Sequence, residues 1–300
     1  TTRGRSTTTT NTMQSPEKTD TAPSPEKNNK EAEPHDTLAS SAFQRLEPLL
    51  ITSATMPLPQ DPDVTCGSLA CGLRYYIKKN QKPEQRVALR LAVRVGSLQE
   101  EEAERGIAHM VEHLAFRATT NYDKLELVEY LESIGAAFGA CQNAYTSFDE
   151  TVYMLSVPSD GKDLVKQSIQ VLHEWACRIR ISDEDVEAER GIVLEEWRAG
   201  RTSAGRMAED YWKQLVQGSK YAERMPIGLE NVIREANGAL VRGLYARLYR
   251  PSQMAAVIVG DFESATALVA MLEEEFGSEP PLVGLEREAL MAPPVPVPVP

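Results

Sequence analysis

The sequence has 300 residues, of which 42% are hydrophobic and 25% are charged, so it carries enough apolar material for a sizeable globular core. Its 44 acidic and 32 basic residues give a net charge of −12, which repels phosphate backbones and disfavours a nucleic-acid partner. It contains no run of about eighteen apolar residues, so we expect no membrane span. Four cysteines are too few for a disulfide scaffold.

The two ends of the chain differ in composition from its middle. Residues 1–55 are rich in Thr, Ser, Pro, Lys and Glu, with SPEK at 15–18 and again at 24–27, and this composition favours a disordered tail. The first twelve residues have two arginines and no acid, which also fits the remnant of a chloroplast or mitochondrial transit peptide. Residues 286–300 end in PPVPVPVP, which predicts an extended linker or a truncated end.

The middle segment, 56–285, mixes strand and helix patterns. In chain order we expect strands at 73–79 and 87–95, helices at 106–116 and 124–134, strands at 136–144 and 151–157, a helix at 163–178, a helix from Ser182 to 198, helical segments past 211 and at 241–249, a strand at 254–260 and a helix at 265–276. This order predicts an α+β domain, in which helices cover a mixed or antiparallel sheet.

Two of the chain's four histidines form the pattern His109-x-x-Glu112-His113. On a helix these three side chains fall within an arc of about 100°, so they share one face. Two imidazoles one turn apart can bind one zinc ion, and a carboxylate beside them can reach a metal-bound water. The alternative is an amphipathic helix that carries histidines by chance, and the scarcity of histidine in this chain disfavours it.

A catalytic zinc site needs a third protein ligand. Glu189 and Glu196 are seven residues apart in a predicted helix, so they lie about 20° from alignment and both can face the histidines. One would bind the metal and the other would accept the N–H of a ligand imidazole. The residues alone do not decide which of the two glutamates binds the metal and which accepts the N–H. Glu195 is rotated by about 100° and we expect it to be solvated.

Seven separated stretches resemble one known family. They are LPQDPDV (58–64), GLRYYIKKN (72–80), GIAHMVEHLAF (106–116), NAYTSFDETVY (143–153), ERGIVLEEWR (189–198), YAERMPIG (221–228) and YRPSQMAAVIVGDF (249–262). In this order they resemble the insulinase/pitrilysin family of zinc metallopeptidases, which carry HxxEH, and within it the PQQ-associated zinc protease branch. The resemblance covers 58–276, which corresponds to the N-terminal catalytic domain only.

The resemblance implies a role for each residue of the predicted metal site. By motif, His109 and His113 correspond to ligands of a single zinc ion, and Glu112 corresponds to the general base. Glu196 corresponds to the third ligand, and Glu189 to the carboxylate that supports a ligand histidine. The implied activity is that of a zinc-dependent metalloendopeptidase, which hydrolyses oligopeptides or unfolded protein segments.

The resemblance also implies how a substrate is held. Asn143 and Ala144 correspond to the family's edge strand, to which an extended peptide adds as a further strand. In the family a C-terminal half or second subunit closes a chamber over the peptide, so we expect such a partner. The alternative function is a non-catalytic scaffold subunit of a processing complex with the same fold. Scaffold members usually lose part of the zinc set, which is complete here.

Three other features are expected to lie apart from the metal site. Arg117-Ala118 follows the HxxEH helix where the family more usually has Asn-Gly, and we expect it not to touch the zinc set. His173 is predicted to be a packed or surface histidine, and Cys177 a small core residue. Cys66 and Cys71 fit neither a redox pair nor a zinc knuckle, so we expect free thiols.

Overall fold

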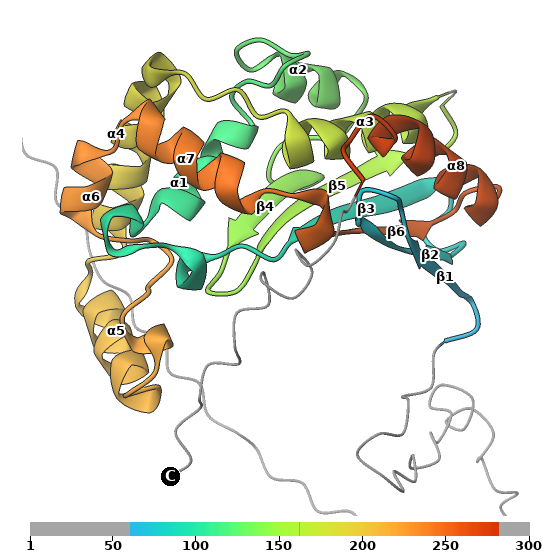
Figure 1. Ribbon diagram of the computed structural model, residues 1–300. Coiled ribbons are helices and arrows are strands. Elements are labelled where there is room, and N and C mark those ends of the chain that lie inside the picture. Colours follow the sequence, from blue (N-terminus) through green and yellow to red (C-terminus); the bar gives the residue numbers. More distant parts are fainter. Residues whose placement is uncertain (1–60, 162, 282–300) are drawn as a thin grey trace, which may run out of the picture. The chain divides into compact units, whose positions relative to one another are not determined.

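A six-stranded mixed sheet forms one layer of the structure, a computed structural model that describes residues 61–161 and 163–281 (Figure 1). The strands are β1 Val64–Ser68, β2 Arg74–Lys79, β3 Arg86–Val93, β4 Gln142–Thr146, β5 Thr151–Pro158 and β6 Met254–Gly260. Their order across the sheet is β1-β2-β6-β3-β5-β4. Neighbours are antiparallel except β2 and β6, which are parallel. The sequence predictions for 1–55 and 286–300 lie outside the described residues.

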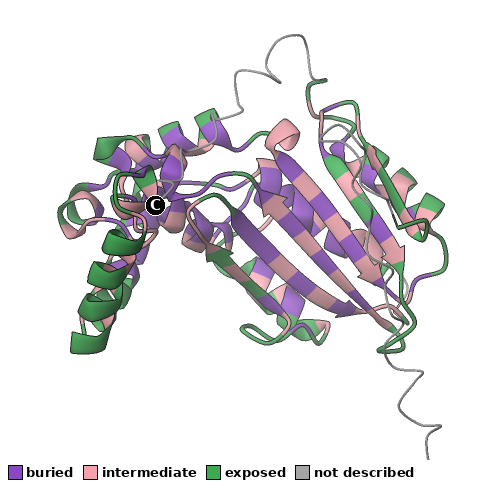
Figure 2. Cartoon of the chain, turned by 90° about the horizontal axis from the view of Figure 1, so that it is seen from below, coloured by how far each residue is buried: buried purple, intermediate pink, exposed green. Residues whose placement is uncertain are grey.

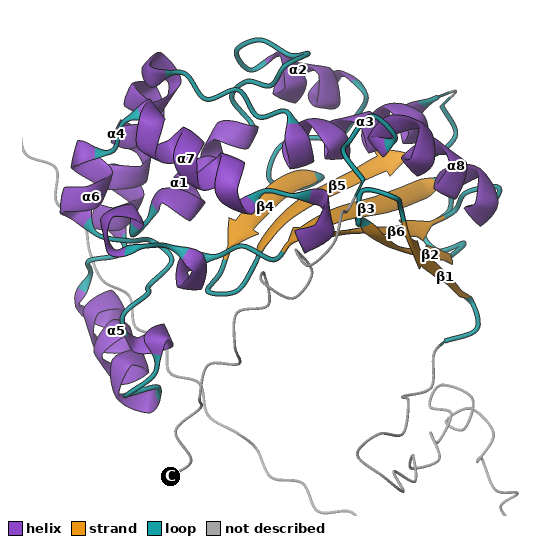
Figure 3. Cartoon of the chain, viewed as in Figure 1, coloured by secondary structure: helices purple, strands orange, loops and turns teal. Residues whose placement is uncertain are grey.

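Helices form the second layer (Figure 3). They are α1 Ile107–Ala115, α2 Glu126–Ser133, α3 Leu164–Cys177, α4 Asp183–Ala199, α5 Ser203–Leu215, α6 Glu230–Glu235, α7 Gly238–Leu248 and α8 Ala265–Phe276. α3 and α8 lie side by side over the sheet, whereas α4 and α7 pack against α1 near β4, and α6 packs against α4 (Figure 1). This arrangement confirms the predicted fold class. No helix in the described part of the chain is both long enough and apolar enough to cross a membrane.

Alternating burial explains why the central strands form. In β3, Val87, Leu89, Leu91 and Val93 are fully buried under the helices, and the residues between them are only partly covered. Figure 2 shows this banding of buried and intermediate residues along the strands from the opposite side of the sheet. A strand with one apolar face is the pattern expected when helices cover only one side of a sheet.

Two strand predictions need correction. The strand predicted at 136–144 begins only at Gln142, because Gly135 and Gly139 adopt positive φ angles and fold 136–141 into turns. β1 was not predicted, because its five residues, VTCGS, have no buried apolar side chain. Both segments lie at or beside an edge of the sheet, where burial leaves a weaker pattern in the sequence.

Candidate metal centre

The histidine helix, α1, is fixed at its start by a buried carboxylate. Gly106 precedes the helix with φ 103°, and its N–H donates to both oxygens of Glu100 at 3.0 and 3.1 Å. The N–H of Ala108 donates to Glu100 Oε1 at 2.8 Å. The carboxyl group of Glu100 therefore accepts from N–H groups that a helix start leaves without partners. Met110 and Leu114 are fully buried, which turns the opposite face of α1 toward α4 and β4.

The structure brings His109, His113 and Glu196 together. Glu196 Oε2, from the last turns of α4, lies 3.6 Å from His109 Nε2 and 3.5 Å from His113 Nε2. Zinc bonds of about 2.0–2.2 Å in a tetrahedral site place neighbouring donor atoms about 3.3–3.6 Å apart. The two distances to Glu196 therefore fit a shared zinc ion. Their donor atoms form one of the groups within 4.8 Å of one another that are suited to a metal.

Glu189 occupies a different position from Glu196. Its Oε2 lies 3.5 Å from His113 Nδ1, the ring nitrogen opposite to the one that faces Glu196. An acceptor at Nδ1 fixes the tautomer of His113 so that the lone pair of Nε2 is free for a metal. The two carboxylates, two turns apart on α4, thus lie on opposite sides of one imidazole.

Arg117 contacts this group, contrary to the sequence-based expectation. It leaves the end of α1 and donates from Nη1 to Glu189 Oε1 at 3.0 Å and from Nε to Asp185 Oδ1 at 2.8 Å. Burial raises the pKa of Glu189, but the bonds from His113 and Arg117 outweigh it and the net shift is downward. Arg117 therefore keeps Glu189 charged beside His113. The sequence offered no signal for this contact, because Arg117 and Glu189 are 72 residues apart.

The electrostatics leave the two histidines in different states. Burial, and to a lesser extent His113, lower the pKa of His109 to about 4, so its imidazole is neutral at neutral pH. Burial also lowers the pKa of His113, but Glu189, Glu196 and Glu112 together raise it above its usual value. Nδ1 of His109 is buried and has no hydrogen-bond partner among the described residues.

Glu112 is nine-tenths buried beside the histidines. Burial raises the pKa of its carboxyl group, and a hydrogen bond from Thr146 acts in the opposite direction. Thr146 Oγ1 donates to Glu112 Oε2 at 2.6 Å and lies 3.2 Å from Thr151 Oγ1. A threonine on the edge strand thus orients the carboxylate. The sequence could have indicated this residue, because side chains alternate between the two faces of a strand and Thr146 therefore lies on the same face of β4 as Ala144.

A cavity of about 810 Å³ opens beside these residues. Its walls include His109, Glu112, His113, Glu189 and Glu196, the β4 residues 143–146, and the apolar side chains of Phe116, Leu125, Val128, Phe138 and Ile192. β4 pairs only with β5 in the described sheet, so one side of its backbone is at the edge. Asn143 is exposed on this strand and Ala144 is half-buried. The structure therefore places the two predicted substrate residues beside the predicted metal ligands.

The Glu100 contact predicts how stability depends on pH. Burial raises the pKa of Glu100 to about 8 from its usual 4.5, although the N–H groups of Ala108 and Gly106 lower it. The folded protein therefore binds this proton more tightly than the unfolded chain does. The stabilising contribution is complete below 4.5 and is lost as the pH rises toward 8.

We expect the Glu100→Gln variant to lack this loss of stability with rising pH, because its amide oxygen still accepts but does not titrate. Glu100→Ala should be less stable by about 1–3 kcal/mol, because two buried N–H groups lose their partner. Urea unfolding at about pH 5 and about pH 8 measures both effects. An identical pH dependence in wild type and Glu100→Gln would contradict the assignment.

Comparison with known proteins identifies the family. Residues 75–218 match the family described as Insulinase (Peptidase family M16). The fold is likewise that of insulinase-family metallopeptidases: the first half of the periplasmic protease PqqL from Escherichia coli superposes with a TM-score of 0.71 and 38% identity, over 74% of this chain and 47% of that one. The chain therefore contains a domain of the insulinase family, peptidase family M16.

Two curated plant relatives are similar over most of this chain. A zinc protease PQQL-like protein from Arabidopsis thaliana is 50% identical over 222 residues, which are 72% of this chain and 23% of that protein. A chloroplastic stromal processing peptidase from Arabidopsis thaliana is 34% identical over 243 residues, 80% of this chain and 18% of that protein. The chain thus spans about a quarter or less of the length of these relatives.

Proposed function

We propose that residues 56–285 form the zinc-binding catalytic domain of a metalloendopeptidase. The observation that carries this proposal is the spacing of Glu196 Oε2, at 3.6 and 3.5 Å from the Nε2 atoms of His109 and His113, with Glu112 on the same face of α1. Relatives named as zinc proteases support the metal and the reaction class. One zinc ion would be held by these two histidines and Glu196.

Different residues of the chain have separate roles in the proposed peptide hydrolysis. When bound, zinc supplies Lewis-acid polarisation of the scissile carbonyl and lowers the pKa of a water molecule. Glu112 accepts the proton of the attacking water and later donates it to the leaving amine. Thr146 holds the Glu112 carboxylate in place through its hydroxyl, at 2.6 Å. Glu189, held by Arg117, keeps His113 in the tautomer whose Nε2 faces the metal position.

An extended peptide is the substrate that this cavity fits best. The open edge of β4 offers backbone groups at 143–146 for strand addition, and this edge forms part of the cavity wall. The apolar side chains of Phe116, Phe138 and Ile192 would contact apolar side chains of the peptide. A folded protein cannot present a free strand so readily, so we expect unfolded segments or oligopeptides to be cleaved.

Partner and location follow as parts of the same proposal. The relatives are about four times as long as the matched region, which supports a further half that closes over the cavity. The similarity to a chloroplastic stromal processing peptidase supports a plastid location. A non-catalytic scaffold is less well supported, because all four groups of the catalytic set are present and adjacent.

Hydrolysis of an unstructured peptide, with and without a chelator, tests the proposed function. We expect cleavage that stops when zinc is removed and returns when zinc is added back. Because the chain spans only part of its relatives, the assay is run both on the chain alone and after addition of the remainder of a relative such as the Arabidopsis protein. Cleavage that is unaffected by chelation, or zinc-loaded protein that stays inactive in both forms, would contradict it.

A further inference from the structure

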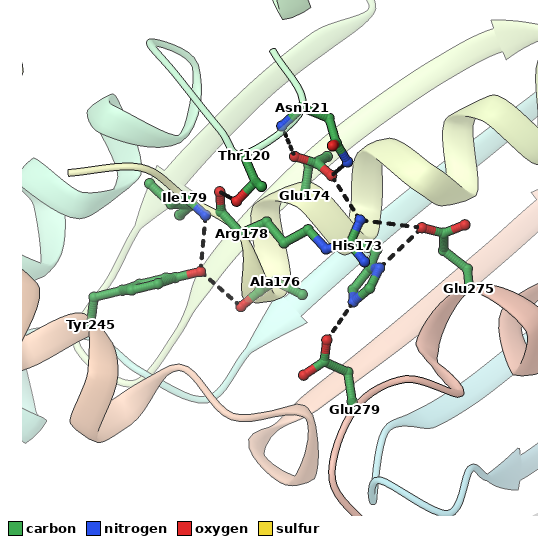
Figure 4. Close-up of polar contacts among 10 residues, drawn as sticks. All are labelled: Thr120, Asn121, His173, Glu174, Ala176, Arg178, Ile179, Tyr245, Glu275 and Glu279. Atoms are coloured by element: carbon green, nitrogen blue, oxygen red, sulfur yellow. Dashed lines mark hydrogen bonds and ion pairs between the residues drawn. The ribbon is translucent and has the colours of Figure 1, made fainter. Parts of the chain in front are cut away.

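A second group of metal-binding side chains lies away from α1, at the end of α3. His173 is completely buried there, and each of its ring nitrogens faces a carboxylate (Figure 4). Nδ1 lies 3.0 Å from Glu275 Oε1, on α8, and Nε2 lies 2.8 Å from Glu279 Oε1, just after α8. A neutral imidazole has only one N–H, so it can donate to only one of these two oxygens. The other contact requires a second positive group, either a second proton or a metal ion.

Cys177 supplies a third donor atom at this point. It is one turn after His173 on α3, so its sulfur lies on the same face of the helix, just as His113 follows His109 on α1. Donor atoms of His173, Cys177 and Glu279 all lie within 4.8 Å of one another. Nitrogen, sulfur and carboxylate oxygen together are a donor set that suits zinc and its neighbours in the transition series.

The charges around His173 favour a cation beside Glu279. Arg178 lies 3.2 Å from Glu174 and 4.0 Å from Glu275, the carboxylate at Nδ1 of His173. Glu279 Oε1 lies 2.8 Å from His173 Nε2, and its carboxylate and the Cys177 sulfur lie within 4.8 Å of each other. A divalent cation bound to one carboxylate and one thiolate would be neutralised without a charge on the imidazole.

A path from solvent reaches this group. A cavity of about 450 Å³ has Cys177, Glu279 and Cys71 in its wall, together with Tyr245 and Arg250. Cys71, a free thiol in the turn between β1 and β2, also lies in the wall of this cavity, but its sulfur is not one of the three donor atoms that lie within 4.8 Å of one another. Entry through a cavity is a requirement for a metal site with protein ligands.

We propose that His173, Cys177 and Glu279 bind a second zinc-like divalent ion, with Glu275 as the acceptor that orients the imidazole. Zinc bonds of about 2.0–2.3 Å place neighbouring donor atoms about 3.3–3.6 Å apart, against the present 2.8 Å between Nε2 and Glu279 Oε1, so the segment after α8 must shift outward by roughly half an ångström or more. The ion ties that segment to α3. It is a structural site, independent of peptide hydrolysis, because the cavity that leads to it shares no lining residue with the cavity beside His109 and His113.

Cobalt, as a coloured substitute for zinc, tests this proposal in the double variant His109→Ala/His113→Ala, which removes the first site. We expect one equivalent of cobalt to bind and to give the near-ultraviolet charge-transfer band that a thiolate ligand produces. Adding Cys177→Ser should abolish the band, because serine keeps the shape but not the sulfur ligand. Cys66→Ser is the matched control, because Cys66 is exposed on β1, and it should leave the band unchanged.

Two results would overturn the second site. One is no cobalt binding by the folded double variant. The other is a band that persists in Cys177→Ser. If the double variant does not fold, zinc titration of the otherwise unchanged chain decides instead. The proposal requires two equivalents for the unchanged chain and one for Cys177→Ser, and equal stoichiometry in the two proteins would refute it.

Discussion

Glu112→Gln should retain zinc and lose peptide hydrolysis by about 10²–10⁴-fold, the usual contribution of a general acid–base residue. Glutamine has the same shape and can still accept the hydrogen bond that Thr146 donates at 2.6 Å. It cannot accept the proton of the attacking water at neutral pH. The loss should therefore appear in kcat, with zinc content unchanged.

Zinc content by atomic absorption and kcat on an unstructured peptide are measured on the same preparation. Glu132→Gln is a matched control, because Glu132 lies in the wall of the same cavity but comes from α2. The control should keep its kcat, which separates a loss of the base from a loss of negative charge in the cavity. A Glu112→Gln protein with nearly wild-type kcat would remove Glu112 from the mechanism.

Replacing Glu196 and Glu189 one at a time should give two different losses of zinc affinity. Glu196→Gln removes a direct ligand and leaves only two histidines, so we expect the chain to bind no stoichiometric zinc after dialysis. Glu189→Gln changes only the group that orients His113 Nδ1, so we expect zinc to be retained with about 10–100-fold weaker affinity.

The zinc Kd of each variant, from competition with a fluorescent chelator, decides between the two carboxylates. Glu195→Gln is the control for charge on this stretch of α4, since Glu195 points to solvent and pairs with Arg198. It should bind zinc as the wild type does. If Glu189→Gln loses zinc and Glu196→Gln keeps it, the two roles are exchanged and the site as described is wrong.

The helix pair around the metal position was predictable because its signals are local. The three-residue and four-residue spacings of His109, Glu112 and His113 place the three side chains on one face of a helix, independently of how the rest of the chain folds. The seven-residue spacing of Glu189 and Glu196 does the same for α4, although spacing alone could not separate their roles. That required the observation that they lie on opposite nitrogens of His113.

The features that sequence missed depend on contacts between distant segments. Arg117 and Glu189 meet only because α1 and α4 pack together, and Thr146 reaches Glu112 only because β4 is the edge strand beside α1. His173 was predicted to be packed or exposed, and it is indeed fully buried. Its carboxylate partners come from α8 and the segment after it, about a hundred residues further along the chain than His173. A local sequence pattern therefore could not predict these contacts.

The central claim is that His109, His113 and Glu196 hold a catalytic zinc ion. X-ray diffraction on either side of the zinc absorption edge, from crystals of the chain grown with zinc, locates the ion directly. The geometry predicts an anomalous peak bonded to the Nε2 atoms of both histidines and to a carboxylate oxygen of Glu196. No peak between the two imidazoles, or a peak bonded to Glu189 in place of Glu196, would contradict it.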